Sequence, residues 1–143
     1  MADGIERDTL GLPRVDLGDR VRWETDRRGR LLIFDCSNNN RDEAYALFDA
    51  FQRTVLPEPP GTVRVLMDFE NAAHETELTR RWKEASLDHN RQITKAAMVG
   101  VTGGMKIVLA AYRFYARMKG MEIETKTAFF EDETAARAWL EVE

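Results

Sequence analysis

Residues 20–36 read RVRWETDRRGRLLIFDC, and two different strand patterns meet in this stretch. In its first half, apolar residues such as Val21 and Trp23 alternate with charged ones, which is typical of a strand with one buried face. A turn follows that ends in Gly29, a residue free to adopt a positive φ. The run 31–34 is then continuously apolar, as in a strand covered on both faces. This stretch therefore predicts an antiparallel hairpin.

Segments with helical and strand periodicity alternate after the hairpin. Asn40 and Glu43 have the spacing of a capping box at the start of the first helix. We expect helices at about 40–55, 75–93, 105–119 and 132–140, a tight turn at 102–104, and strands at 62–69, 96–101 and 123–129. The order β-β-α-β-α-β-α-β-α predicts an α/β fold, with four helices and a mixed, mostly parallel five-stranded sheet.

Length and composition fit one ordinary globular domain. The chain has 143 residues, of which 43% are hydrophobic and 32% charged. We expect residues 1–19 to form a flexible or loosely docked arm and 20–143 to form the domain. We expect neither a secretion signal, because residues 1–8 lack the basic-then-apolar order, nor a membrane span, and Cys36 is the single cysteine. A cytoplasmic protein is therefore expected.

The charge does not favour nucleic acid as a partner, because the formal net charge is −4. Its distribution is uneven. Arginines gather at 20–30 and 80–91, whereas the C-terminal part is acidic. The molecule can therefore have two faces of different charge, although a charged run is most often only a solvated face.

Three segments carry a resemblance to a known family. They are the strand Val65-Leu66-Met67-Asp68, the strand at 95–100, and the closing pattern in which Phe129-Phe130 precedes a helix with Trp139-Leu140. Over about residues 20–143 this pattern resembles the SpoIIAA-like branch of the STAS superfamily. The resemblance implies a small bacterial α/β domain without enzymatic activity that binds a protein partner. It also implies a second use, known from related Sec14-type proteins, of holding apolar ligands.

Anti-sigma-factor antagonists of the same superfamily carry an Asp-Ser-Ser/Thr-Gly signature where the third strand passes into the next helix, and its phosphorylation switches partner binding. The corresponding stretch here is Glu75-Thr76-Glu77-Leu78, which lacks both the Ser pair and the Gly. A phosphate on Thr76 would be favoured by the helix N-terminus but opposed by the two glutamates. The alternative is that Thr76 is only a cap or first-turn residue.

The loop between the fourth strand and the third helix is a candidate anion site. Thr102, Gly103, Gly104 and Lys106 lie where free backbone N–H groups and a helix dipole can hold a phosphate. The loop matches neither the dinucleotide-binding nor the P-loop motif. The two glycines are explained equally well by a tight turn.

Residues at the carboxyl ends of the second and third strands could form an active site. If the strands are parallel neighbours, Asp35 and Asp68 lie together there and could share a proton or a cation. His74 could approach Cys36 as a thiolate–imidazole pair. The alternative is that the aspartates cap turns and the cysteine fills space. We predict no catalytic residue, metal or cofactor, and we expect His89 to be a packed histidine.

The third helix has an apolar arc of roughly 220°, wider than one sheet contact needs. We expect Val108, Tyr112 and Tyr115 to lie in an interface or an apolar pocket, because tyrosines suit contact surfaces. Packing inside the domain is the alternative. We therefore predict a non-enzymatic regulatory or protein-interaction domain that self-associates as a homodimer. The alternatives are a carrier or sensor of a small apolar ligand or lipid, and an enzyme using the sheet edge.

Overall fold

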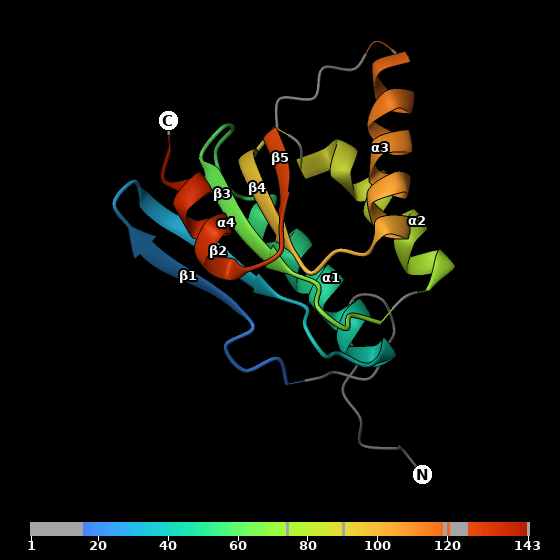
Figure 1. The fold of residues 1–143 in the computed structure, drawn as a ribbon, viewed down its shortest axis with the longest axis horizontal. Coiled ribbons are helices and arrows are strands. Elements are labelled where there is room, and N and C mark those ends of the chain that lie inside the picture. Colours follow the sequence, from blue (N-terminus) through green and yellow to red (C-terminus); the bar gives the residue numbers. More distant parts are fainter. Residues whose placement is uncertain (1–15, 74, 90, 119, 121–125, 143) are drawn as a thin grey trace.

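The computed structural model describes residues 16–73, 75–89, 91–118, 120 and 126–142, with only the backbone at 83, 86–89, 105, 108, 109, 112, 115 and 116. Figure 1 shows its helices and strands. In chain order they are β1 (Val21–Asp26), β2 (Gly29–Asp35), α1 (Arg41–Val55), β3 (Val63–Asp68), α2 (Thr76–His89), β4 (Ile93–Val99), α3 (Gly103–Met118), β5 (Lys126–Phe130) and α4 (Glu133–Leu140).

The strands form one mixed sheet in the order β1-β2-β3-β4-β5. β1 runs antiparallel to β2, and the following strands pair in parallel. At the hairpin turn, Asp26 pairs with Gly29, whose φ is +112°, and the Arg28 N–H donates to Asp26 Oδ1 at 2.8 Å. The predictions of a single α/β domain and of a mixed five-stranded sheet are confirmed.

Side chains of β2 alternate between the two faces of the sheet, and both faces are covered. Leu32 and Phe34 belong to an apolar cluster that includes the inner side of α1. Leu31 and Ile33 belong to a second cluster, which Leu140 of α4 completes. Figure 1 shows α1 and α4 on opposite faces of the sheet. This arrangement confirms that the apolar run of β2 is buried from both sides.

The start of α1 is fixed by the predicted capping box. The Asn40 Oδ1 accepts from the Glu43 N–H at 2.9 Å, and the Asn40 N–H donates to Glu43 Oε1 at 3.1 Å. Two backbone donors that a helix start leaves unpaired are thereby satisfied. The helix then buries an apolar stripe that includes Leu47 and Phe51.

A cluster of aromatic rings holds α2 against α1 and the sheet. The Trp82 ring centroid lies 4.9 Å from that of Phe48, 5.2 Å from Phe51 and 5.8 Å from Phe34. The predicted end of this helix at Ile93 is wrong. Ile93 is buried and pairs with Val63 as the first residue of β4, because its apolar spacing fits the sheet as well as the helix stripe.

The prediction of a tight turn at 102–104 is also wrong. The Lys106 N–H donates to the Thr102 carbonyl at 3.0 Å, so α3 already begins at Gly103. Glycine costs roughly 1 kcal/mol in a helix relative to Ala, but the first turn can accommodate it. β5 is described from Lys126, and the expected start at 123 lies outside the described residues. No helix in the described part of the chain has both the length and the apolarity to cross a bilayer.

Two cations from neighbouring strands bind the C-terminal end of α4. Arg64 and Lys95 are register partners on β3 and β4. Arg64 Nη1 donates to the Leu140 carbonyl at 3.0 Å, and Lys95 Nζ donates to the carbonyls of Trp139 (3.2 Å) and Val142. The last carbonyls of a helix are unpaired and partially negative, so these contacts both cap α4 and anchor it.

Arg64 also anchors the hairpin. Its guanidinium binds both carboxylate oxygens of Asp26, at 2.6 and 2.7 Å, and the carbonyls of Gly29 and Arg30. Both charged side chains are about nine-tenths buried. The paired guanidinium holds the pKa of Asp26 below its usual value. One buried residue thus joins β1, β2, β3 and α4.

Candidate functional site

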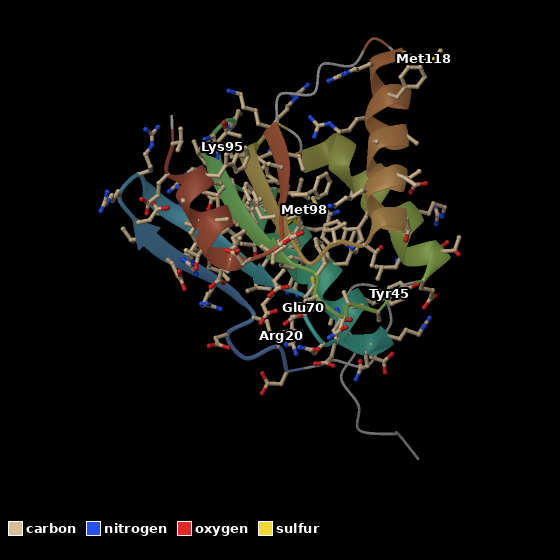
Figure 2. All side chains as sticks on the ribbon, viewed as in Figure 1. Arg20, Tyr45, Glu70, Lys95, Met98 and Met118 are labelled. Atoms are coloured by element: carbon tan, nitrogen blue, oxygen red, sulfur yellow. The ribbon has the colours of Figure 1, made fainter. Side chains whose placement is uncertain are left out.

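The carboxyl ends of β2, β3 and β4 meet at one edge of the sheet, which is where open α/β sheets bind ligands. Pairing continues there beyond the strands. The Cys36 N–H donates to the Asp68 carbonyl and the Phe69 N–H to the Val99 carbonyl, both at 2.8 Å. Figure 2 labels Glu70 at this edge. The loops are therefore held as extensions of the sheet.

Polar side chains tie the loops after β2 and β3 to each other. Asn71 Nδ2 donates to Asn38 Oδ1 at 3.1 Å, and the Ala73 N–H donates to Asn39 Oδ1 at 2.6 Å. Asn38 and Asn71 have φ values of 50° and 54°, a left-handed conformation that Asn tolerates better than most residues. The loops use these polar groups for their own structure.

Asp35 and Asp68 lie side by side, as the parallel arrangement predicts, since they are register partners. Asp35 Oδ1 accepts from the backbone and the hydroxyl of Ser37, and Asp68 Oδ1 accepts from the Glu70 N–H. Burial raises the pKa of Asp68, and Asp35 adds to the rise. Among the described residues no group of three or more His, Cys, Asp or Glu could hold a metal. Both aspartates thus stabilise turns.

The chemistry of Cys36 is limited by its position. The side chain is buried in the cluster that α1 covers, and burial raises the pKa of the thiol well above its ordinary value. A thiolate, the form that acts as a nucleophile, is disfavoured there. His74 lies outside the described residues, as does the side chain of His89. The approach of His74 to Cys36, which the sequence leaves possible, therefore lies outside the described residues.

A glycine that the sequence analysis did not single out controls the approach of two of these loops. Gly100 has a φ of +73°, and a Cβ there would lie 2.8 Å from the Glu70 N and Cα atoms. Real side chains do not come that close to backbone. Only glycine allows the loop after β4 to lie against the loop after β3. A glycine directly after a buried strand is the signal that could have identified it.

The predicted anion-binding residues lie directly before α3 and in its first turn. Thr102, Gly103 and Gly104 are exposed, and added Cβ atoms at the two glycines would meet nothing within 4 Å. Lys106 Nζ lies 5.4 Å from the Phe129 ring centroid on β5. The structure shows no close backbone approach that would require these glycines. Anion binding here stays a prediction.

Thr76 is the exposed first residue of α2, and acidic groups surround it. The Glu75 carboxylate accepts from Tyr45 Oη at 2.8 Å and pairs with Arg41 Nε at 2.7 Å. The Tyr45 hydrogen bond is the main cause of a lowered pKa at Glu75. Glu77 follows on the other side. Phosphorylation of Thr76 stays a prediction, and these carboxylates would repel the added charge.

A shallow depression of about 300 Å³ lies between α1 and α2. Its guanidinium groups already have partners: Arg80 contacts Glu84 at 2.6 Å, and Arg81 contacts Glu77 at 3.2 Å. Hydrogen bonds from Arg80 and Arg81 lower the pKa of Glu77 to about 2. These carboxylates offset the positive charge that an anionic ligand would need. The lining residues are Phe48, Arg80, Arg81, Glu84 and Ala85.

α3 carries three of the large apolar side chains that are exposed on the described surface. Ile107 and Met118 are 72% exposed and Phe114 is 65% exposed. Figure 2 labels Met118 at the end of this helix, on the rim of the molecule. The side chains of Val108, Tyr112 and Tyr115 lie outside the described part of the helix, so their predicted contacts stay predictions. The exposed residues belong to the same apolar arc.

Comparison with known proteins identifies a family. Residues 32–141 match the family model described as SpoIIAA-like. No curated protein and no solved structure matches the chain. The matched range runs from within β2 to just past α4, and so includes all of the described elements from α1 to α4.

Proposed function

The chain belongs to the SpoIIAA-like family, and on this premise we propose that it is a non-enzymatic regulatory domain that binds a protein through α3. The observation that carries the proposal is the exposure of Ile107, Phe114 and Met118 along one helix. Large apolar side chains gathered on a surface mark contact sites. Aromatic anchors such as Phe114 carry much of the free energy of protein interfaces.

The sheet edge supports a binding domain over an enzyme. Asp35 and Asp68 are engaged in turns, and Cys36 is buried with a raised pKa. A catalytic group needs access to substrate and a pKa suited to its task. The proposal places the domain in the bacterial cytoplasm, where a single free cysteine fits reducing conditions.

Photo-crosslinking in the host cell tests this function. A benzophenone amino acid replaces Phe114 in one variant and Arg27, a 91% exposed residue of the hairpin turn, in the control. We expect a discrete protein adduct from position 114 and none from position 27. The adduct can contain a second copy of the chain or another protein. Equal labelling at both positions, or no protein adduct, would contradict a binding role of α3.

A carrier of a small apolar ligand is the second candidate. It is favoured by Phe129 of β5, which is 36% exposed and lies near the start of α3. A pocket between α3 and β5 would bury this ring together with a ligand. Native mass spectrometry of the purified protein distinguishes the two functions, since a carrier retains an added mass that organic extraction removes. A catalytic role would instead require a turnover that Asp68→Asn abolishes.

A further inference from the structure

We propose that two copies of this chain pair through α3 in antiparallel orientation, about a two-fold axis between Ala110 and Ala111. This inference rests on the proposed function and names the partner as a second copy. It comes from the positions of large and small exposed residues along the helix. A two-fold contact requires a surface that is complementary to itself.

Six small or apolar residues of α3 form one narrow stripe. At about 100° per residue, the stripe residues fall within an arc of about 100°. The side chains of this arc are all exposed. They are Gly103, Ile107, Ala110, Ala111, Phe114 and Met118.

The stripe is symmetric about its own centre. In an antiparallel pair centred between Ala110 and Ala111, Ile107 lies opposite Phe114 of the second copy. Met118 then lies opposite Gly103, so that the longest side chain meets the smallest residue. The two alanines meet at the axis, where they allow the helices to approach closely. The apolar contact of Ile107 with Phe114 thus lies between a close approach of the helices at the axis and a pairing of a large with a small residue at each end, so that the two helix surfaces interdigitate.

The charges of α3 predict how the affinity of the two copies for each other depends on salt. Lys106, Arg113 and Arg117 lie on one side of the stripe, and the helix carries no acidic residue. A two-fold axis perpendicular to the helices brings the basic sides of both copies to the same side of the pair. Their repulsion opposes association at low salt and is screened at high salt. Dimerisation should therefore become tighter as salt is added.

The size of the stripe predicts a reversible dimer. α3 is 16 residues long, which corresponds to a length of about 24 Å. One helix pair of this length belongs to the small interfaces, below about 1,200 Å² in total. We therefore expect exchange between monomer and dimer in the micromolar concentration range rather than a permanent dimer.

Sedimentation equilibrium of the purified full chain is the first test. We expect a monomer–dimer equilibrium whose dissociation constant falls as NaCl rises from 50 to 500 mM. Phe114→Glu should weaken the dimer at least tenfold, because it places a carboxylate opposite Ile107. Arg27→Glu, at the exposed hairpin turn, is the matched control. Circular dichroism checks that both variants fold, and Phe114→Ala replaces the first variant if it does not.

Cysteine crosslinking tests the orientation. Disulfides form when Cα atoms lie within about 7 Å. Position 111 lies beside the axis, so the cysteine of Ala111→Cys should form a disulfide with the same residue of the second copy. The two cysteines of a Met118→Cys pair, in contrast, lie about 22 Å apart along the helices and should not. Arg27→Cys measures random collisions, and native Cys36 is buried. In a parallel pair, both positions on α3 would crosslink.

Each alternative result is decisive. A monomer at all concentrations, a dimer unchanged by Phe114→Glu, or equal crosslinking of Ala111→Cys and Met118→Cys would overturn the inference. So would a dimer that salt weakens. If the purified protein is monomeric but position 114 crosslinks to another protein in cells, the inference fails and the proposed function stands. Binding of α3 to anionic vesicles alone would contradict both.

Discussion

Replacing Gly100 by alanine should strongly destabilise the fold, because two independent costs meet at this position. The φ of +73° is left-handed, and this conformation costs an L residue with a side chain about 1–2 kcal/mol in free energy. The new Cβ would also lie 2.8 Å from two backbone atoms of Glu70, and overpacking of this kind adds about 1–3 kcal/mol. The expected loss in the free energy of unfolding is therefore about 2–5 kcal/mol.

Two glycine variants separate these costs in urea unfolding followed by circular dichroism. Gly61 has a φ of +71°, and a Cβ there would meet nothing within 4 Å, so Gly61→Ala should lose only about 1–2 kcal/mol. Gly104 lies in α3 with open space around it, so Gly104→Ala should gain about 0.5–1 kcal/mol. If Gly100→Ala loses no more than Gly61→Ala, the close approach to Glu70 is not rigid and the reasoning is refuted.

Three further predictions concern buried or capping groups. Asp26→Asn should lower the free energy of unfolding at pH 7 by about 3–5 kcal/mol, because the buried Arg64 loses its charge partner. The pKa of Asp26 is lowered in the folded state, so this stabilisation is present above the ordinary carboxyl range and is lost as the pH falls through the folded pKa. The variant and wild-type stabilities should converge in acid, and a gap independent of pH would argue against the ion pair. Asn40→Ala should cost about 1 kcal/mol in thermal unfolding whereas Asn40→Asp should not, and equal melting temperatures would show that the cap is unimportant. A thiol reagent should label Cys36 only as fast as the protein unfolds, since burial raises its pKa, and rapid labelling of the native protein would contradict the burial.

The parts of the fold that the sequence predicts are those whose signals are local. The hairpin turn depends on Asp26 and Gly29, three positions apart, and the start of α1 on Asn40 and its third neighbour. The contacts of Arg64 with residues 38 positions earlier and 76 later could not be predicted in this way. Charged residues in a strand look solvent-exposed until the tertiary structure supplies their partners.

The candidate site likewise has features that the sequence predicts and features that depend on the tertiary structure. The adjacency of Asp35 and Asp68 follows from parallel neighbours, and the register confirms it. The apolar arc of α3 is visible in the sequence, but which side of it is covered depends on other elements. The exposure of Ile107 and Phe114 is therefore a finding of the structure. The contact of Gly100 with Glu70 joins two loops and has no local signal beyond the glycine itself.

The order of strands in the sheet equals their order in the chain. Each new strand can therefore add to the edge left by the one before it, and no strand has to wait for a distant segment in order to pair. Short loops close at a lower entropic cost than long ones, and folding rates rise as the sequence separation of contacts falls. The strands should accordingly pair one after another in chain order, beginning with the β1–β2 hairpin. The slow step should be the docking of α4, whose carbonyls must find Arg64 and Lys95 after both strands are in place.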